Sequence, residues 1–275
     1  MTDRYAVVGN PIGHSKSPVI HSRFAEQTGQ DLVYEALLAP IGEFPAFLNE
    51  FRATGGRGLN VTVPFKEDAF AACDERSDRA ALARAVNTIW FDGDCVHGDN
   101  TDGVGLVTDL EVNQRITLAN TKILLVGAGG ATRGVLAPLL EAGPSEVMIV
   151  NRTRARAVAL VDELADLRVR ACGFGELGSV AYDSIINASA AGLDGEAPPL
   201  PFAALAVGGT CYDMVYGPQT TPFLRWAQAA GADHRVDGLG MLVEQAAESF
   251  RRWRGVRPST QPVINELRSE LTKSS

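Results

Sequence analysis

A glycine-rich segment between an apolar run and a helical pattern constrains the fold of this chain more than any other feature. Residues 122–126 are almost continuously apolar, which is typical of a central parallel strand. Small residues fill most of positions 127–131, and apolar residues at helical spacing follow from Val135. A strand, a glycine turn and a helix in this order predict a dinucleotide-binding unit.

The positions of the glycines suggest how a dinucleotide would bind. Gly127 permits a tight turn, and Gly129 allows the backbone to approach a pyrophosphate over the helix N-terminus, where free N–H groups favour negative charge. Thr132 occupies the usual third glycine position, so the fingerprint is a variant. A glycine turn without a ligand is the alternative. The predicted cofactor-binding residues of this segment are Gly127, Ala128, Gly129, Gly130 and Ala131.

The residues after the next strand-like run, 146–150, indicate which dinucleotide binds. NAD-binding chains usually carry an acidic residue here, which bonds the ribose 2′-hydroxyl, but residues 151–156 contain none. Guanidinium groups bind phosphate in a bidentate manner, so Arg152, Thr153 and Arg156 are predicted to hold the 2′-phosphate of NADP, beside Asn151. For Arg154, a solvated position at the start of a helix is an alternative.

Strand-like and helix-like patterns alternate along all 275 residues, which favours an α/β fold with largely parallel sheets. Strands are predicted at 5–8, 32–37, 59–63, 88–91, 95–97, 122–126, 146–150, 184–187 and 209–212, and helices at 18–27, 78–85, 104–110, from about 239, and at 263–271. The predicted domains are a first one at 1–102, to which 238–275 returns, and a dinucleotide-binding domain at 103–237.

Composition excludes several classes of function. The net charge of −8 disfavours binding to nucleic acid or to an anionic membrane. The four cysteines form no C-x-x-C pair and no histidine cluster accompanies them, so neither a disulfide framework nor a metal site is predicted. The sequence shows no signal peptide and no apolar stretch long enough to span a bilayer, so a cytoplasmic location is expected.

Several polar residues, most of them in the first hundred positions, occupy places where the fold does not require a polar side chain. Asn60 and Thr62 share one face of a predicted strand, because the valines beside them occupy the other face. Together with Ser15, Ser17, Lys66, Asn87, Asp102 and the later Gln245, they could supply carboxylate-binding hydroxyls, amides and a Lys–Asp pair. Each also has a structural alternative: a helix cap for Ser17 and Asp102, the solvent face of an edge strand for Asn60 and Thr62, and a solvated helix start for Lys66.

Eight segments, in order along essentially the whole chain, resemble the signatures of shikimate dehydrogenases. They are residues 9–18, 60–66, 85–88, 98–103, 127–131, 151–153, 212–216 and 237–242. The resemblance implies an open α/β substrate-binding domain and a Rossmann-type NADP domain with a cleft between them. It also implies an NADP-dependent oxidoreductase of the aromatic amino acid precursor pathway, which interconverts 3-dehydroshikimate and shikimate.

The resemblance also implies roles for individual residues. Lys66 and Asp102 would be the catalytic pair, and Ser15 and Ser17 would hold the substrate carboxylate. Further substrate contacts would come from Thr62, Asn87, Tyr216 and Gln245, and Met214 and Gly238 would line the nicotinamide site. Residues 189–192, near the cofactor, carry fewer hydroxyls than many members of the family.

Two other functions remain open at this point. One is a quinate/shikimate dehydrogenase that prefers NAD, and the other is a non-catalytic sensor of shikimate or of a dinucleotide. The presence of both Lys66 and Asp102 disfavours the sensor. The chain is expected to act as a monomer or a homodimer on a small molecule, with no nucleic-acid or membrane partner.

Overall fold

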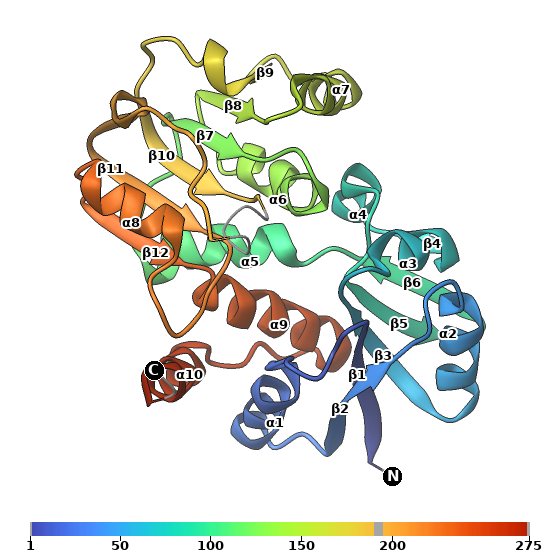
Figure 1. Cartoon of the computed structure of the whole chain (residues 1–275). Helices are drawn as coiled ribbons and strands as arrows, with labels where there is room; N and C mark the ends of the chain where they lie inside the picture. Colours follow the sequence, from blue (N-terminus) through green and yellow to red (C-terminus); the bar gives the residue numbers. More distant parts are fainter. Residues whose placement is uncertain (1, 190–194, 274–275) are drawn as a thin grey trace.

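The computed structural model describes residues 2–189 and 195–273, and it contains two six-stranded sheets at opposite ends of the molecule (Figure 1). The strands of the first sheet are β1 (Asp3–Gly9), β2 (Leu32–Leu38), β3 (Gly56–Val61), β4 (Glu75–Arg76), β5 (Thr88–Asp92) and β6 (Cys95–Asp99). Their order is β2-β1-β3-β5-β6-β4. β5 runs antiparallel to both β3 and β6, and the other pairings are parallel.

Helices cover both faces of the first sheet. The helices of this half are α1 (Ser17–Thr28), α2 (Phe44–Ala53), α3 (Lys66–Ala72) and α4 (Asp78–Ala83). On one face, Phe44 of α2 and Ala69 of α3 pack with Val8 and Leu59 of the sheet. The C-terminal helices α9 (Leu239–Arg254) and α10 (Gln261–Lys273) pack with α1 in a second apolar cluster that contains Phe24 and Phe250. A buried side chain of this size contributes roughly 1.5–3 kcal/mol to stability.

The second sheet is parallel throughout and has the doubly wound strand order of dinucleotide-binding domains. Its strands are β7 (Lys122–Val126), β8 (Glu146–Val150), β9 (Val169–Cys172), β10 (Tyr182–Asn187), β11 (Leu205–Asp213) and β12 (His234–Asp237), in the order β12-β11-β10-β7-β8-β9. The chain order reverses between β7 and β10, and ligands bind at such a point in open α/β sheets.

The alternating side chains of β7 explain why this sheet is covered on both faces. Ile123 and Leu125 pack against the helices α5 (Asp102–Thr108) and α6 (Gly130–Glu141). Leu124 and Val126 point to the opposite face, where they join a cluster with α8 (Pro222–Ala229). The described residues of this half also form α7 (Arg154–Leu164), the 3₁₀ turns η2 (Phe174–Glu176) and η4 (Phe202–Ala204), and a π-helical turn, η1 (Asp109–Asn113).

Helices α5, α6 and α9 lie between the two sheets (Figure 1). α5 packs closely on α9, because a Cβ added at Gly105 would lie 2.8 Å from the Met241 carbonyl oxygen. α5 also approaches α6, because a Cβ at Gly103 would lie 2.7 Å from the Gly134 carbonyl oxygen. These glycines allow the backbones of the three helices to meet next to Asp102, the first residue of α5.

The predicted elements are confirmed, with shifts at several ends. The strands at 122–126 and 146–150 have the predicted bounds, and the predicted hairpin is the antiparallel pair β5–β6. The predicted helix 104–110 instead begins at Asp102 and passes into the π-helical turn at Asp109. β4, β9 and β12 were not predicted, because they are only two to four residues long and lack an apolar run.

Candidate active site

The polar residues singled out in the sequence meet at one end of the strands of the first sheet. β1, β3 and β6 run in the same direction, so their carboxyl ends lie at this end of the sheet, and antiparallel β5 begins there. The loop after β1 carries Ser15, Ser17 begins α1 at the end of this loop, and Asn87 directly precedes β5. The chain leaves β6 at Asp99 and reaches Asp102 three residues later.

Lys66 and Asp102 form a direct ion pair at this end of the sheet. The Lys66 Nζ lies 2.6 Å from Asp102 Oδ2, and the two side chains are 29% and 13% exposed. The other carboxylate oxygen, Oδ1, accepts a hydrogen bond of 2.7 Å from Asn87 Nδ2. The Asp102 backbone N–H donates to Asn100 Oδ1 at 3.1 Å. The carboxylate is therefore held on both oxygens, which fixes the position of the ammonium group.

These contacts exclude two alternatives considered from the sequence, a solvated Lys66 and a helix-capping Asp102. Lys66 does begin helix α3, but its charge is paired and is not simply solvated. Asp102 is not a helix cap, because the capping position of α5 is Thr101 and Asp102 is the first helical residue. Sequence patterns cannot separate these cases, because a residue at a helix start can face solvent or a neighbouring strand.

A cavity of about 250 Å³ opens beside the ion pair. All the predicted catalytic and substrate-binding residues line it: Lys66, Asp102, Ser15, Ser17, Asn60, Thr62, Asn87, Tyr216 and Gln245. Met214 and Gly238, from the end of the molecule that holds the second sheet, line it as well. Its volume lies below the range of about 300–1,000 Å³ usual for drug-sized ligands, so it suits a small molecule.

Sequence reasoning assigned no role to several other lining residues. His14 and Lys16 flank Ser15, and Ile12, Met241 and Leu242 supply apolar wall. His14 and Lys16 are basic residues next to Ser15 and Ser17, the serines predicted to bind a carboxylate. Their basic character is the sequence feature that could have indicated a place in the site.

The start of α1, where Ser15 and Ser17 lie, differs from the helix cap expected from the sequence. α1 begins at Ser17 itself, with Lys16 at the capping position and no side-chain cap. The Ser17 backbone N–H donates to Ser15 Oγ at 3.3 Å, so Ser15 shapes the loop. The expectation that Ser17 caps the helix is therefore wrong, and Ser17 is one of the residues that line the cavity.

Asn60 lies in the cavity wall, but its amide is engaged inside the protein. Its Oδ1 accepts from the Tyr34 hydroxyl at 2.7 Å, and its Nδ2 lies 2.9 Å from Ser249 Oγ and 3.2 Å from Thr88 Oγ1. β3 lies between β1 and β5, so the alternative of a solvent-facing edge strand is wrong. The contacts of Asn60 join the sheet to α9.

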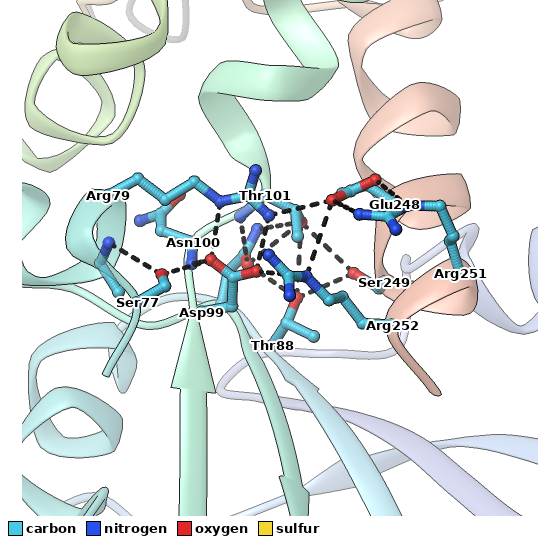
Figure 2. A network of polar contacts seen from close by, with 12 residues as sticks. Ser77, Arg79, Thr88, Asp99, Asn100, Thr101, Glu248, Ser249, Arg251 and Arg252 are labelled. Atoms are coloured by element: carbon cyan, nitrogen blue, oxygen red, sulfur yellow. Dashed lines mark hydrogen bonds and ion pairs between the residues drawn. The ribbon is translucent and has the colours of Figure 1, made fainter. Parts of the chain in front are cut away.

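A charged network lies beside these contacts and ties the end of β6 to α4 and α9 (Figure 2). The fully buried Asp99 accepts two hydrogen bonds from Arg79, at 2.7 and 2.6 Å, and lies 3.1 Å from Arg252. Burial acts to raise the pKa of Asp99, but the hydrogen bonds from Arg79 and Ser77 and the charges of Arg79 and Arg252 together outweigh it and hold this pKa below its usual value. Arg79 also pairs with Glu248 of α9 at 3.1 Å. The network fixes the chain three residues before Asp102.

The glycine loop lies at the switch point between β7 and β10, where the second sheet can accept a pyrophosphate. Gly127 has a φ of 109°, and a Cβ there would lie 3.2 Å from the Ala188 backbone. At Gly129 and Gly130 a Cβ would meet nothing within 4 Å, so the space over the N-terminus of α6 is open. Thr132, in the third glycine position, is buried and donates to the Gly127 carbonyl at 2.9 Å, which closes the turn from inside. The residues present therefore fit a dinucleotide.

The arginines after β8 differ in their partners. Arg154 pairs with Glu176 at 3.0 Å. Arg152 and Arg156 are exposed, and neither forms an ion pair within the described ranges 2–189 and 195–273. Asn151 Nδ2 donates to the Thr153 carbonyl at 2.9 Å and shapes the turn. Two guanidinium groups are thus available to an anion.

The cofactor-binding residues predicted at 127–131 and 151–156 lie outside the cavity lining, whereas Met214 and Gly238 lie in it. A side chain on Gly238 would overlap the Met214 carbonyl, so only glycine fits there. Of the segment 189–192, the structure describes Ser189, whose hydroxyl donates to Asn187 Oδ1 at 2.7 Å. The remaining three residues lie outside the described part of the chain.

Comparison with known proteins identifies the family. Residues 7–89 match the shikimate dehydrogenase substrate binding domain, residues 111–193 match "Shikimate / quinate 5-dehydrogenase", and residues 238–268 match the shikimate 5′-dehydrogenase C-terminal domain. A shikimate dehydrogenase (NADP⁺) of Alkalilimnicola ehrlichii is 58% identical over 98% of this chain and 100% of that protein. The chain belongs to the shikimate dehydrogenase family. The resemblance seen in the sequence is thereby confirmed.

Several solved structures share the fold of this shikimate dehydrogenase family member. An Ael1 enzyme from Pseudomonas putida superposes with a TM-score of 0.92 at 47% identity, covering 97% of this chain and 98% of that one. A shikimate 5-dehydrogenase of Thermus thermophilus, solved with NADP(H) and shikimate, gives 0.86 at 38% identity, covering 98% and 99%. Among the described residues, no helix is both long and apolar enough to cross a membrane.

Proposed function

We propose that this chain interconverts 3-dehydroshikimate and shikimate with NADP(H), and that Lys66 is the general acid and base of the reaction. The observation that carries the proposal is the Lys66–Asp102 ion pair of 2.6 Å at the wall of a cavity that Met214 and Gly238 also line. The relatives support the substrate and the cofactor, because they are named shikimate dehydrogenases (NADP⁺).

The proposed chemistry needs a proton donor beside the reacting carbonyl. When bound, NADPH supplies the hydride to the C3 carbonyl carbon. The Lys66 ammonium donates its proton to the oxygen on which negative charge develops, and its charge stabilises that oxygen. Asp102 orients the ammonium group, and Asn87 orients Asp102. In the oxidation of shikimate, Lys66 takes the proton back.

The remaining residues would bind and align the two ligands. Ser15 and Ser17 would hold the substrate carboxylate, and Thr62, Asn87, Tyr216 and Gln245 would contact its ring hydroxyls or carbonyl. Gly127–Ala131 would receive the pyrophosphate, and Arg152, Thr153 and Arg156, beside Asn151, the 2′-phosphate. We propose domains at 1–102 with 238–275, and at 103–237. A cytoplasmic location and a monomer or homodimer remain predictions from the sequence.

Replacement of Lys66 tests the mechanism. The variant Lys66→Ala should lose about 10²–10⁴-fold in kcat, the usual contribution of general acid–base catalysis, with little change in shikimate affinity. The measurement is NADPH formation from shikimate, together with calorimetric binding of shikimate. Lys122→Ala, at an exposed lysine that begins β7, is the control. A near-normal kcat in Lys66→Ala would refute the assigned role.

A quinate/shikimate dehydrogenase that prefers NAD is the second candidate, because one matching family model is described as shikimate/quinate 5-dehydrogenase. The missing acid after β8 argues against NAD. Comparing kcat/KM for both dinucleotides, each with shikimate and with quinate, separates the two functions. Turnover by any of these pairs would rule out the non-catalytic sensor, which the Lys66–Asp102 pair already disfavours.

A further inference from the structure

Three side chains with metal-binding atoms meet at the far edge of the first sheet, among residues that do not line the cavity. β4 is a two-residue edge strand that pairs with β6 and places Glu75 opposite His97. Cys95 and His97 are two residues apart on β6 and therefore point to the same face. Val96, between them, points to the other face and packs in the core.

The ligand atoms lie at distances that suit a small divalent ion. A Glu75 carboxylate oxygen, Cys95 Sγ and a His97 ring nitrogen all lie within 4.8 Å of one another. His97 Nδ1 and Glu75 Oε2 are 3.3 Å apart. Tetrahedral zinc, with bonds of about 2.0–2.3 Å, holds its ligand atoms roughly 3.3–3.8 Å apart. The Glu75 side chain is 70% exposed and can rotate, so its carboxylate can adjust to an ion held by Cys95 and His97.

The surroundings favour a cation and limit the freedom of the imidazole. The Trp90 ring stacks on the His97 ring, with centroids 5.2 Å apart and an interplanar angle of 6°. The carboxylates of Glu75, Asp74 and Asp92 lie near the Cys95 thiol, and Arg52 adds an opposing positive charge. The same carboxylates create a negative potential that attracts a divalent ion, and a bound ion would in turn stabilise the thiolate.

We propose that Glu75, Cys95 and His97 form a site for a divalent transition-metal ion of the zinc class, with water as the fourth ligand. A thiolate and an imidazole select such an ion over magnesium or calcium, which prefer oxygen ligands. The site spans the edge strand β4 and the start of β6, and β6 leads to Asp99 and the catalytic Asp102. A bound ion therefore clamps the strand that carries the active-site loop.

Cobalt titration of the full, reduced chain tests the site, because Co²⁺ replaces Zn²⁺ and reports a thiolate ligand by its charge-transfer absorption. The chain should bind Co²⁺ with this band and with the visible bands of tetrahedral cobalt, and added Zn²⁺ should abolish both. Zn²⁺ should also raise the Tm of the chain, because an ion that binds the folded state stabilises it.

Matched variants identify the ligands. Cys95→Ser should lose the charge-transfer band, and Glu75→Gln and His97→Asn should bind Co²⁺ at least about tenfold more weakly, since even supporting partners of metal sites cost roughly 10–100-fold. Cys172→Ser removes a buried thiol of the second half and should behave as the parent chain. The proposal is overturned if the parent chain shows no band, or if the band persists in Cys95→Ser.

Discussion

Arg152, Arg154 and Arg156 lie within five residues of the chain, and among the residues that the structure describes only Arg154 has a carboxylate partner, Glu176. This difference predicts how each arginine contributes to cofactor choice. Arg152→Ala or Arg156→Ala should lower kcat/KM for NADP by about tenfold or more, because hydrogen bonds to charged groups contribute roughly 1.5–3 kcal/mol. The kcat/KM for NAD, which lacks the 2′-phosphate, should hardly change.

Arg154→Ala is the matched control for this prediction, because its guanidinium group already pairs with Glu176. Steady-state kinetics with both dinucleotides provide the measurement. An equal decrease of kcat/KM with NADP and with NAD would show that the arginines support the fold of the loop and do not bind the 2′-phosphate.

Asp99 is fully buried and pairs with Arg79 and Arg252. Asp99→Asn should lower the free energy of unfolding by up to about 3–5 kcal/mol, because Arg79 and Arg252 then share the single carboxylate of Glu248 in this buried network. Urea denaturation measures the change. Asp94→Asn removes an exposed partner of Arg52 and should cost no more than about 1 kcal/mol.

The pH dependence of this effect follows from the lowered pKa of Asp99. The unfolded chain, in which the carboxyl returns to its ordinary pKa of 3.8, binds more protons than the folded chain in acid. The stabilisation by Asp99 is therefore present above pH 3.8 and is lost as the pH falls through the lower folded value. Stability of the parent chain should fall more steeply in this range than stability of Asp99→Asn, and parallel curves would contradict the assignment.

Helix α5 approaches α9 closely only because Gly105 has no side chain. A Cβ there would lie 2.8 Å from both the Met241 carbonyl oxygen and the Gln245 backbone nitrogen, which cannot move without shifting α9. Gly105→Ala should therefore cost about 1–3 kcal/mol of stability, as overpacking does. It should also raise the KM for shikimate, because α9 carries Gln245.

Urea denaturation and steady-state kinetics measure the two effects of Gly105→Ala. The control is Gly175→Ala, where an added Cβ meets nothing within 4 Å. Unchanged stability in Gly105→Ala would show that the two helices can separate at no cost.

The elements that the sequence predicted best are those with long apolar runs. β7 and β8 have the predicted bounds, because buried parallel strands leave few polar positions. The edge strand β4, with the exposed residues Glu75 and Arg76, has no such run and forms only because β6 lies beside it. The π-helical turn at Asp109–Asn113 has no sequence signal either, and its buried Asp109 makes a contact far along the chain, accepting from the Tyr212 hydroxyl at 2.7 Å.

The site was predicted as a set of residues, but not as a set of contacts. The motifs supplied Lys66 and Asp102, whereas the contacts of Asn60 with Ser249 required knowledge of where α9 packs. The cluster of Glu75 and His97 was missed for a similar reason. Its members are 22 positions apart, and strand pairing, not sequence spacing, brings them together.

At the scale of the whole molecule, α9 couples the two sheets. It packs on α1 beside the first sheet, and its buried Glu244 accepts from Asn113 at 2.9 Å in the turn after α5. We therefore expect the chain to unfold in one cooperative transition. Trp226→Phe leaves Trp90, in β5, and Trp253, which stacks on Tyr5 of β1, as fluorescent probes of the first sheet.

In this variant, the urea midpoints from fluorescence and from far-ultraviolet circular dichroism should coincide, which is the usual test of two-state unfolding. Separate midpoints would show that α9 does not transmit the loss of one sheet to the other.

The packing of the C-terminal helices α9 and α10 against α1, beside the first sheet, also affects how the chain folds during synthesis. The ring of Tyr5, in β1, stacks on Trp253 with centroids 4.7 Å apart, so the first strand made is covered by one of the last helices. At about 5–20 residues per second, a ribosome takes roughly 10–50 s to make the intervening residues. During that interval one apolar face of a nascent sheet stays open to water, so this half of the protein can mature only after release and offers a chaperone a defined surface to shield.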